Sequence, residues 1–183
     1  MGRTVDQIVG RMADTGRVIA RVAEAVGLVI EELDRAVGAS QERRGGYFCW
    51  TADQPGAPVL VHALVGVVSS AEKSERYLRL SCEKAVRLAR LPRHHSSWES
   101  RDEQHERYGG AIRAKGAILS FSGFPETADE AAMLLAALKL GGLSWIDACT
   151  IANTSNNGFL FAIVALLQRA GCWNDGNWTV PTE

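Results

Sequence analysis

The sequence predicts an α/β fold of the α+β type, in which an antiparallel sheet is flanked by helices. Three observations lead to this prediction: two pairs of strand-like segments, a helical segment between the pairs, and helical segments at both ends of the chain. Because short turns separate the strands of each pair, the strands within a pair are expected to run antiparallel.

The first element is a long helix that begins near Thr4 and stops at Gly38. Thr4 and Gln7 form a capping-box pair at its start, and Gly38 is a typical helix end. Residues at alternating steps of four and three place one stripe along the helix: Ile8, Met12, Thr15, Ile19, Val22, Val26, Val29 and Leu33. We expect the stripe to pack across the sheet, and a helix–helix dimer seam is the alternative.

The first strand pair is predicted at 47–50 and 59–68, on either side of a turn at 53–56. The second strand is apolar on both faces, so we expect it to be central and covered on both sides. His62 lies in this strand, on the face that also carries Leu60 and Leu64.

A helix is predicted from the capping box Ser69–Glu72 to about Leu91, before Pro92. Its bases are expected to pair with acids four residues earlier: Glu72 with Arg76, Glu75 with Arg79, and Glu83 with Arg87. These pairs neutralise much of the positive charge of the helix.

The second half of the chain is predicted as a polar segment, a hairpin and further helices. The segment 92–108 is expected to hold a short helix that begins at Ser96 or Ser97. The later elements are a hairpin with strands at 111–114 and 117–122, helices at 126–140, from Ser144 and at 158–170, and a tail with Trp173 and Trp178. We expect this tail to dock on the body or on a neighbouring subunit. The chain is predicted to be a single domain, 1–183, with an α/β core at 1–140 and a helical C-terminal extension at 141–183.

Composition excludes several classes of partner. The 183 residues carry a formal net charge of −1, from 20 Lys and Arg against 21 Asp and Glu, so nucleic acid is not expected as a partner. The longest apolar run, 159–167, is far shorter than the roughly 20 residues that cross a bilayer, so no membrane partner is expected. The cysteines lack zinc-motif or redox-motif spacing and are interpreted as reduced thiols of a cytoplasmic protein: Cys49, Cys82, Cys149 and Cys172.

Part of the chain, 70–138, resembles the GlcG/HbpS family of haem-binding-like domains. The resemblance rests on Gly109-Gly110 before one strand, Ser122-Gly123 at the end of the next, the acidic pair Asp129-Glu130 opening a helix, and Glu83-Lys84-Ala85 on the middle helix. The chain departs from the family at two places. The family usually has Val-Asp-Gly at the position of 48–51, and a proline at the position of Ala111-Ile112. The resemblance implies a profilin-like arrangement of sheet and helices, and haem or another tetrapyrrole as ligand.

A cluster of imidazoles and carboxylates lies between positions 94 and 106. Such donors bind zinc, iron or nickel, and the predicted metal ligands are His94, His95, Glu103, His105 and Glu106. The alternative interpretation is a solvated face on which Arg93, Arg101 and Arg107 neutralise the acids.

The predicted binding site is a pocket between the sheet and the segment 92–108. Its candidate ligand-binding residues are His62, His94, His95, His105, Gly109, Gly110, Ser122 and Gly123. The leading hypothesis is a small-molecule-binding or accessory protein of GlcG/HbpS type that forms a homo-oligomer. The alternatives are a metal-dependent enzyme that uses a divalent transition metal held by the 94–106 cluster, and a structural or regulatory module that oligomerises through its first helix.

Overall fold

The computed structural model describes residues 5–38 and 42–181, and it confirms the α+β class. In chain order the elements are α1 (Val5–Val37), β1 (Arg44–Ala52), β2 (Val59–Val67), α2 (Ala71–Ala89), the 3-10 turns η1 (Ser97–Ser100) and η2 (Glu103–His105), β3 (Ala111–Ala114), β4 (Ala117–Ser122), α3 (Glu126–Lys139), α4 (Trp145–Thr154), α5 (Gly158–Arg169), β5 (Trp173–Asn174) and β6 (Asn177–Trp178).

The main sheet has four antiparallel strands in the order β2-β1-β4-β3. The prediction that the 59–68 strand is central is wrong, because β2 lies at the edge of the sheet. One face of β2 is also open: Leu60 and Leu64 are exposed, whereas Val65 is buried. Both faces of β2 carry apolar residues, but the rest of the protein covers only one of them.

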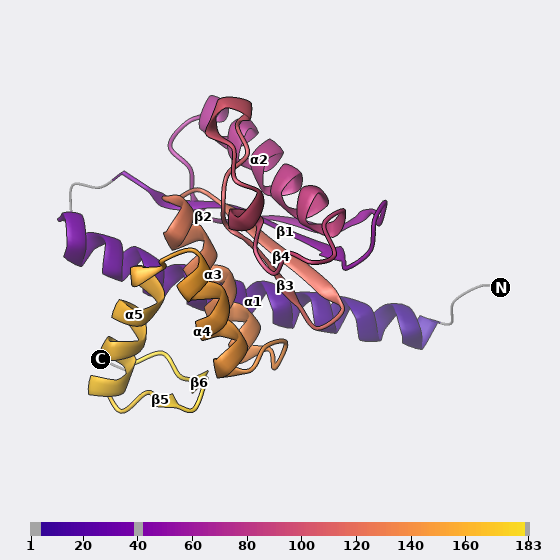
Figure 1. The fold of residues 1–183 in the computed structure, drawn as a ribbon. Helices are drawn as coiled ribbons and strands as arrows, with labels where there is room; N and C mark the ends of the chain where they lie inside the picture. The colour runs from indigo at the N-terminus through magenta and orange to yellow at the C-terminus, as the bar shows by residue number, and fades with distance from the viewer. Residues whose placement is uncertain (1–4, 39–41, 182–183) are drawn as a thin grey trace.

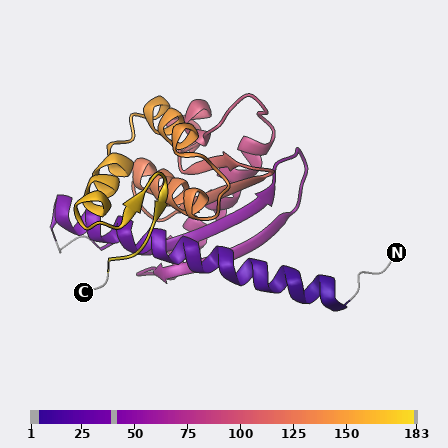
Figure 2. The ribbon, with the colours of Figure 1, turned by 90° about the horizontal axis from the view of Figure 1, so that it is seen from below.

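Helices cover the two faces of the sheet unequally (Figure 1). Helix α2 packs alone on one face, over β1, β4 and β3, while α1 and α3 lie side by side on the other. Helices α4 and α5 pack outside α3, in a further layer. The start of α1 extends past the rest of the fold (Figure 2).

The apolar stripe of α1 packs within its own chain, as the leading prediction for it required. Val22, Val26, Val29 and Leu33 are buried, and α1 contacts α3, β2, β1 and α5. Over this part of the helix the apolar stripe itself is therefore covered by the same chain. Thr4 and the side chains of Gln7, Ile8 and Met12 lie outside the described residues.

Helix α3 forms the centre of the core. All of its residues from Ala128 to Leu138 are buried, because the sheet lies on one side of it and α1, α4 and α5 lie around the rest. Its many alanines suit this position, since small side chains allow neighbouring elements to approach closely. Two acids, Asp129 and Glu130, are buried with the apolar residues.

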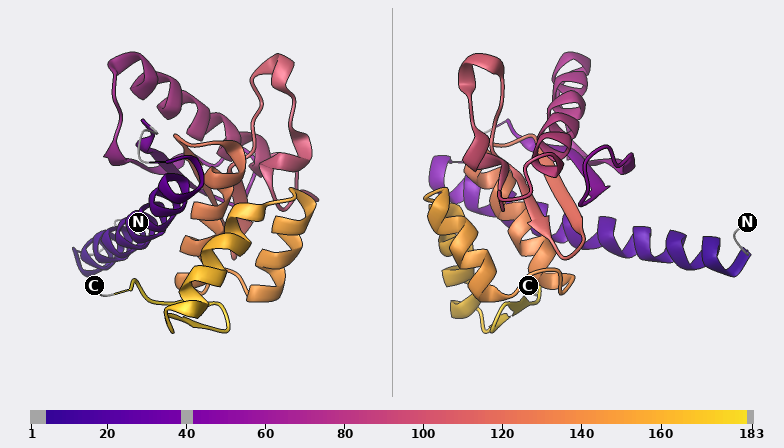
Figure 3. Two further views of the ribbon diagram at one scale, coloured as in Figure 1. Left: turned by 90° about the vertical axis from the view of Figure 1, so that its left-hand side faces the viewer. Right: turned by 45° about the vertical axis from the view of Figure 1, so that its right-hand side comes forward.

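The ends and charges of α2 differ in detail from the prediction. Its cap is Ser70, whose side chain accepts from the Lys73 backbone N–H, and not Ser69. Of the predicted pairs, Glu83–Arg87 forms at 2.8 Å. Arg76 and Arg79 instead reach Glu106 in the segment between α2 and β3, at 3.6 and 2.9 Å. Figure 3 shows this segment standing beside α2 on the same side of the sheet.

The C-terminal region is helical, as predicted, and its tail docks on the body. Ser144 and Asp147 form the predicted capping box of α4. Trp178 is buried, and its indole N–H donates to the Leu135 carbonyl of α3 at 3.0 Å. Within the described residues, every helix is too short or too polar to cross a bilayer.

Candidate functional site

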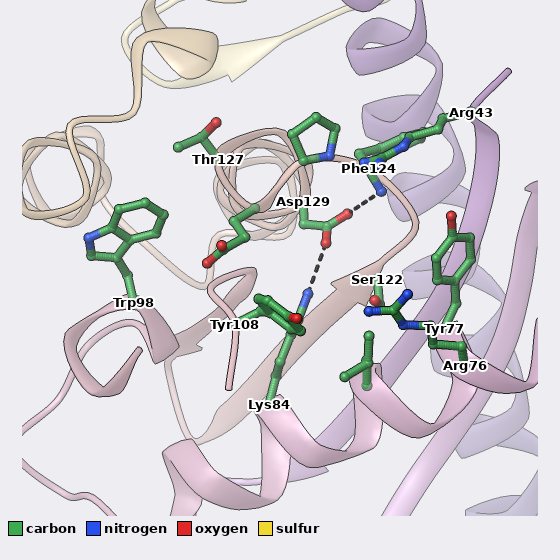
Figure 4. Close-up of a pocket in the computed structure, with 13 residues that line it drawn as sticks. Arg43, Arg76, Tyr77, Lys84, Trp98, Tyr108, Ser122, Phe124, Thr127 and Asp129 are labelled. Carbon is green, nitrogen blue, oxygen red and sulfur yellow. Dashed lines mark hydrogen bonds and ion pairs between the residues drawn. The ribbon is translucent and has the colours of Figure 1, made fainter. Parts of the chain in front are cut away.

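A pocket of about 520 Å³ lies between α2, the segment 92–108 and the connection from β4 to α3 (Figure 4). A pocket beside this segment agrees with the expectation from the sequence, but most of its lining residues do not belong to the predicted site. The lining residues are Arg43, Arg76, Tyr77, Leu80, Lys84, Trp98, Tyr108, Ser122, Phe124, Pro125, Glu126, Thr127 and Asp129.

A buried ion pair between Lys84 of α2 and Asp129 of α3 forms part of the pocket wall. Lys84 Nζ lies 2.8 Å from an Asp129 carboxylate oxygen, and each side chain is 2% exposed. Lys84 also donates to the Phe121 carbonyl at 2.9 Å, and Asp129 accepts from the Phe124 backbone N–H at 2.8 Å. Burial raises the pKa of Asp129 to about 6, although the neighbouring Lys84 opposes this rise.

Gly110 makes this ion pair possible. Its φ is +111°, and a Cβ there would lie 2.7 Å from Asp129 Cβ and 2.9 Å from Lys84 Nζ. A side chain at 110 would therefore displace the pair as well as strain the backbone. The glycine that was predicted to let a ligand approach instead lets a lysine and an aspartate meet.

The pocket carries its two arginines at one end and Trp98 at the other (Figure 4). Arg43 and Arg76 lie near Tyr77 and Ser122, while Trp98 lies at the opposite end. The Arg101 guanidinium is 4.9 Å from the centre of the Trp98 ring.

Both acids that line the pocket already bind groups of the protein. Glu126 accepts from Arg101 Nε and from the Gly109 backbone N–H, and Asp129 accepts from Lys84. The first turn of α3 also forms part of the wall, so the positive end of its dipole lies at the pocket. This arrangement favours an anionic ligand.

The other buried acid of α3, Glu130, lies outside the pocket lining and joins three segments. Its carboxylate accepts from the hydroxyls of Ser96 and Ser155 and from the Asn157 amide, the last at 3.0 Å. Burial raises the pKa of Glu130, and the three donors oppose that rise. Glu130 therefore fixes the segment 92–108 and the α4–α5 connection to α3.

None of the four predicted histidine ligands lines the pocket. His62 is exposed on β2, and His94 has a buried Nδ1 without a hydrogen-bond partner. His105 Nδ1 lies 2.6 Å from an Asp102 carboxylate oxygen, and the backbone N–H of His95 donates to Glu99. A haem held by one of these histidines does not fit the pocket, whose oxygen donors include Tyr77 and Tyr108.

The five predicted metal ligands do not converge. The segment forms two separate 3-10 turns rather than one helix, Glu103 pairs with Arg101, and Glu106 pairs with α2. Among the described residues, the one group of His, Cys, Asp or Glu close enough to share an ion is Cys49, His62 and Cys82. Of these, only His62 was a predicted site residue.

The predicted glycine and serine positions have mixed outcomes. Ser122 lines the pocket, as expected for a residue at its edge. Gly123 instead packs against β1, since a Cβ there would lie 2.3 Å from the Gly45 carbonyl oxygen. At Gly109 a Cβ would lie 2.8 Å from the Trp98 ring, so the absence of a side chain at this position allows the indole to pack against the backbone.

Both residues of the ion pair could be singled out from the sequence. Lys84 and Asp129 both belong to the short motifs on which the resemblance rests, although their contact was not foreseen. Arg43, Arg76 and Tyr108 belong to none of those motifs.

Comparison of the chain with protein-family models, curated proteins and solved structures finds no match.

Proposed function

We propose that this chain is a small-molecule-binding protein whose pocket between α2 and α3 holds a planar organic anion. The observation that carries the proposal is a single pocket lined by two arginines, Arg43 and Arg76, and by aromatic rings that include Trp98. Arginine binds carboxylate or phosphate groups through paired hydrogen bonds, and the aromatic side chains of the lining, Tyr77, Tyr108 and Trp98, suit a flat ring. A tetrapyrrole with carboxylate side chains belongs to this ligand class, and it is the member that the GlcG/HbpS resemblance implies.

Titration with two porphyrins tests the tetrapyrrole. Haemin and metal-free protoporphyrin IX share the ring and the carboxylates but differ in the iron. We expect both to bind the untagged protein saturably, at one per chain, with quenching of tryptophan fluorescence. Equal affinity for the two would match a pocket without a histidine ligand, whereas binding of haemin alone would point to coordination of the iron.

A matched pair of arginine variants separates pocket binding from surface adsorption. Arg76→Gln removes a cation that lines the pocket, while Arg79→Gln removes a neighbouring cation of α2 that also pairs with Glu106 but lies outside the lining. We expect Arg76→Gln to weaken binding about 10-fold, the effect of one charged hydrogen bond, and Arg79→Gln to leave it unchanged.

The wider ligand class has its own test. A thermal-shift panel of aromatic carboxylates and mononucleotides is compared between wild type and Arg76→Gln. Stabilisation that disappears in Arg76→Gln supports the proposal. No stabilisation by any member of the panel, together with no porphyrin binding, would reject it.

We also propose that the chain forms a homo-oligomer through β2. An edge strand offers unpaired backbone groups, and Leu60, Leu64 and Val67 are 53%, 52% and 68% exposed. Leu60→Lys with Leu64→Lys should lower the mass measured by light scattering. Ile146→Lys, at a still more exposed position on α4 (77%), should not. The free thiols of the four cysteines suit the proposed cytoplasmic location.

A further inference from the structure

Three side chains from three elements meet on the α2 side of the sheet. Cys49 of β1 and His62 of β2 are directly opposite in the strand register, and Cys82 comes from α2. Cys82 Sγ lies 2.7 Å from His62 Nε2, and one donor atom from each residue lies within 4.8 Å of the other two. None of the three lines the pocket between α2 and α3.

We propose that Cys49, His62 and Cys82 bind one Zn²⁺ ion. Around tetrahedral zinc, with bonds of about 2.3 Å to sulfur and about 2.0 Å to nitrogen, donor atoms lie roughly 3.5–3.8 Å apart. In the structure the Cys82 and His62 donor atoms are closer than this, at 2.7 Å, and no pair of donor atoms in the group is farther apart than 4.8 Å. Small side-chain rotations that widen the His62–Cys82 contact are enough to admit the ion.

The donor set selects a thiophilic metal. Two thiolates and one imidazole suit zinc, whereas magnesium and calcium prefer oxygen donors. Two thiolates also neutralise a divalent charge in a partly buried place. Burial raises the pKa of both thiols and lowers the pKa of His62, so without metal the thiols keep their protons and the imidazole is neutral.

A second observation at this place is the buried hydroxyl of Ser120. Ser120 lies directly opposite Cys49 on β4, so both side chains belong to the same face of the sheet. Its hydroxyl is buried without a hydrogen-bond partner among the described residues, which is uncommon for a buried polar group. When Cys49 becomes a thiolate, this hydroxyl can donate to its sulfur, as groups behind metal ligands commonly do.

The site is open on one side. Cys49 is buried beside Ala85 and Ala89 of α2, whereas His62 is exposed on the edge strand β2. In a single chain an ion can therefore enter at His62, and the fourth coordination position is open to solvent or, in the proposed oligomer through β2, to the neighbouring subunit. Three protein donors with an open position are typical of zinc sites that bind water or an added ligand.

Metal titration of the reduced, full-length, untagged protein tests the site. Co²⁺ is a spectroscopic probe for tetrahedral zinc sites, because bound thiolates give near-ultraviolet charge-transfer bands. We expect one Co²⁺ per chain with these bands, and stoichiometric displacement of the Co²⁺ by Zn²⁺. Zn²⁺ affinity is then measured by competition with a chromophoric chelator.

Variants assign the donors. Cys82→Ser and His62→Gln, both at incompletely buried positions, should each weaken Zn²⁺ binding about 100-fold, and Cys82→Ser should remove about half of the thiolate absorption. Ser120→Ala should weaken binding about 10-fold. Cys149→Ser is the matched control, since Cys149 is a free thiol on α4. Circular dichroism checks that each variant is folded.

Three results would overturn the proposal. The first is a reduced wild-type protein without thiolate-to-cobalt bands. The second is a loss of affinity in Cys149→Ser as large as that in Cys82→Ser. The third is a Cys49–Cys82 disulfide in protein isolated without reductant that, once reduced, takes up no zinc. Because none of the three residues lines the pocket, failure here leaves the small-molecule proposal intact.

Discussion

The two faces of the sheet use the same alternating strands for different purposes. Toward α1 and α3 the strands present Phe48, Leu119 and Phe121, which join one apolar core. Toward α2 the same strands present Cys49, one of the proposed zinc ligands, and Ser120, which lies opposite it. Two layers of helices stand behind the first face, while a single helix and an irregular segment cover the second. The candidate binding residues therefore lie on the face of the sheet that fewer helices cover, where a ligand can enter.

A large effect is expected on the α2 side, at Lys84. Lys84→Met leaves the Asp129 carboxylate buried without its cation, so we expect a loss of about 4 kcal/mol in the free energy of unfolding at pH 8. Urea denaturation measures it. The loss should shrink toward pH 5, because the folded-state pKa of Asp129, raised by burial, rises further without the lysine and protonation then relieves the buried charge.

The double variant Lys84→Met with Asp129→Asn is the control for this prediction. It removes both charges, so it should recover most of the stability and show little change between pH 5 and 8. If the double variant is as unstable as Lys84→Met at pH 8, the lysine stabilises the fold mainly by packing.

A slightly smaller effect is expected on the apolar side. Leu134→Ala removes a fully buried side chain of α3 and should lower the free energy of unfolding by about 3 kcal/mol. No titratable group is created or removed, so the loss should be the same at pH 5 and pH 8. A pH-dependent loss would contradict the division between the faces.

A smaller effect is expected at Glu130, which links α3 to the segment 92–108 and to the α4–α5 connection. Glu130→Gln keeps the size of the side chain but replaces one acceptor oxygen with an NH₂ group that cannot accept from Ser96, Ser155 or Asn157, so we expect a loss of about 1 kcal/mol at pH 5. The pKa of Glu130 in the folded state lies above its ordinary 4.5, so the stability it contributes is full below 4.5 and declines as pH rises through the folded value. The deficit of Glu130→Gln relative to wild type should therefore shrink with rising pH.

The smallest effect is expected on the open side of β2. Leu64→Asp replaces an exposed side chain, so monomer stability should change by about 0.5 kcal/mol or less. Val65→Asp, at the next position, buries a charge on the opposite face and should cost about 4 kcal/mol or prevent folding. Equal effects of the two substitutions would contradict the observed alternation along β2.

The sequence determined the local structure of this protein. The steps of four and three in α1, the Lys115-Gly116 turn between β3 and β4, and the Ser144–Asp147 capping box each depend on residues a few positions apart, and the structure confirms all three elements. The sequence also determined that 92–108 is polar and begins a short helical turn at Ser96.

Only the tertiary structure decided which strand lies at the edge and which distant side chains meet. Lys84 and Asp129 are 45 positions apart, and Cys49, His62 and Cys82 come from three elements. Hydrophobic periodicity says which face of an element is apolar, but it does not say whether that face will be covered, as Leu60 and Leu64 show. The physical reason is that coverage and contact depend on how whole elements pack, and packing is decided by the total area they bury rather than by any short stretch of sequence.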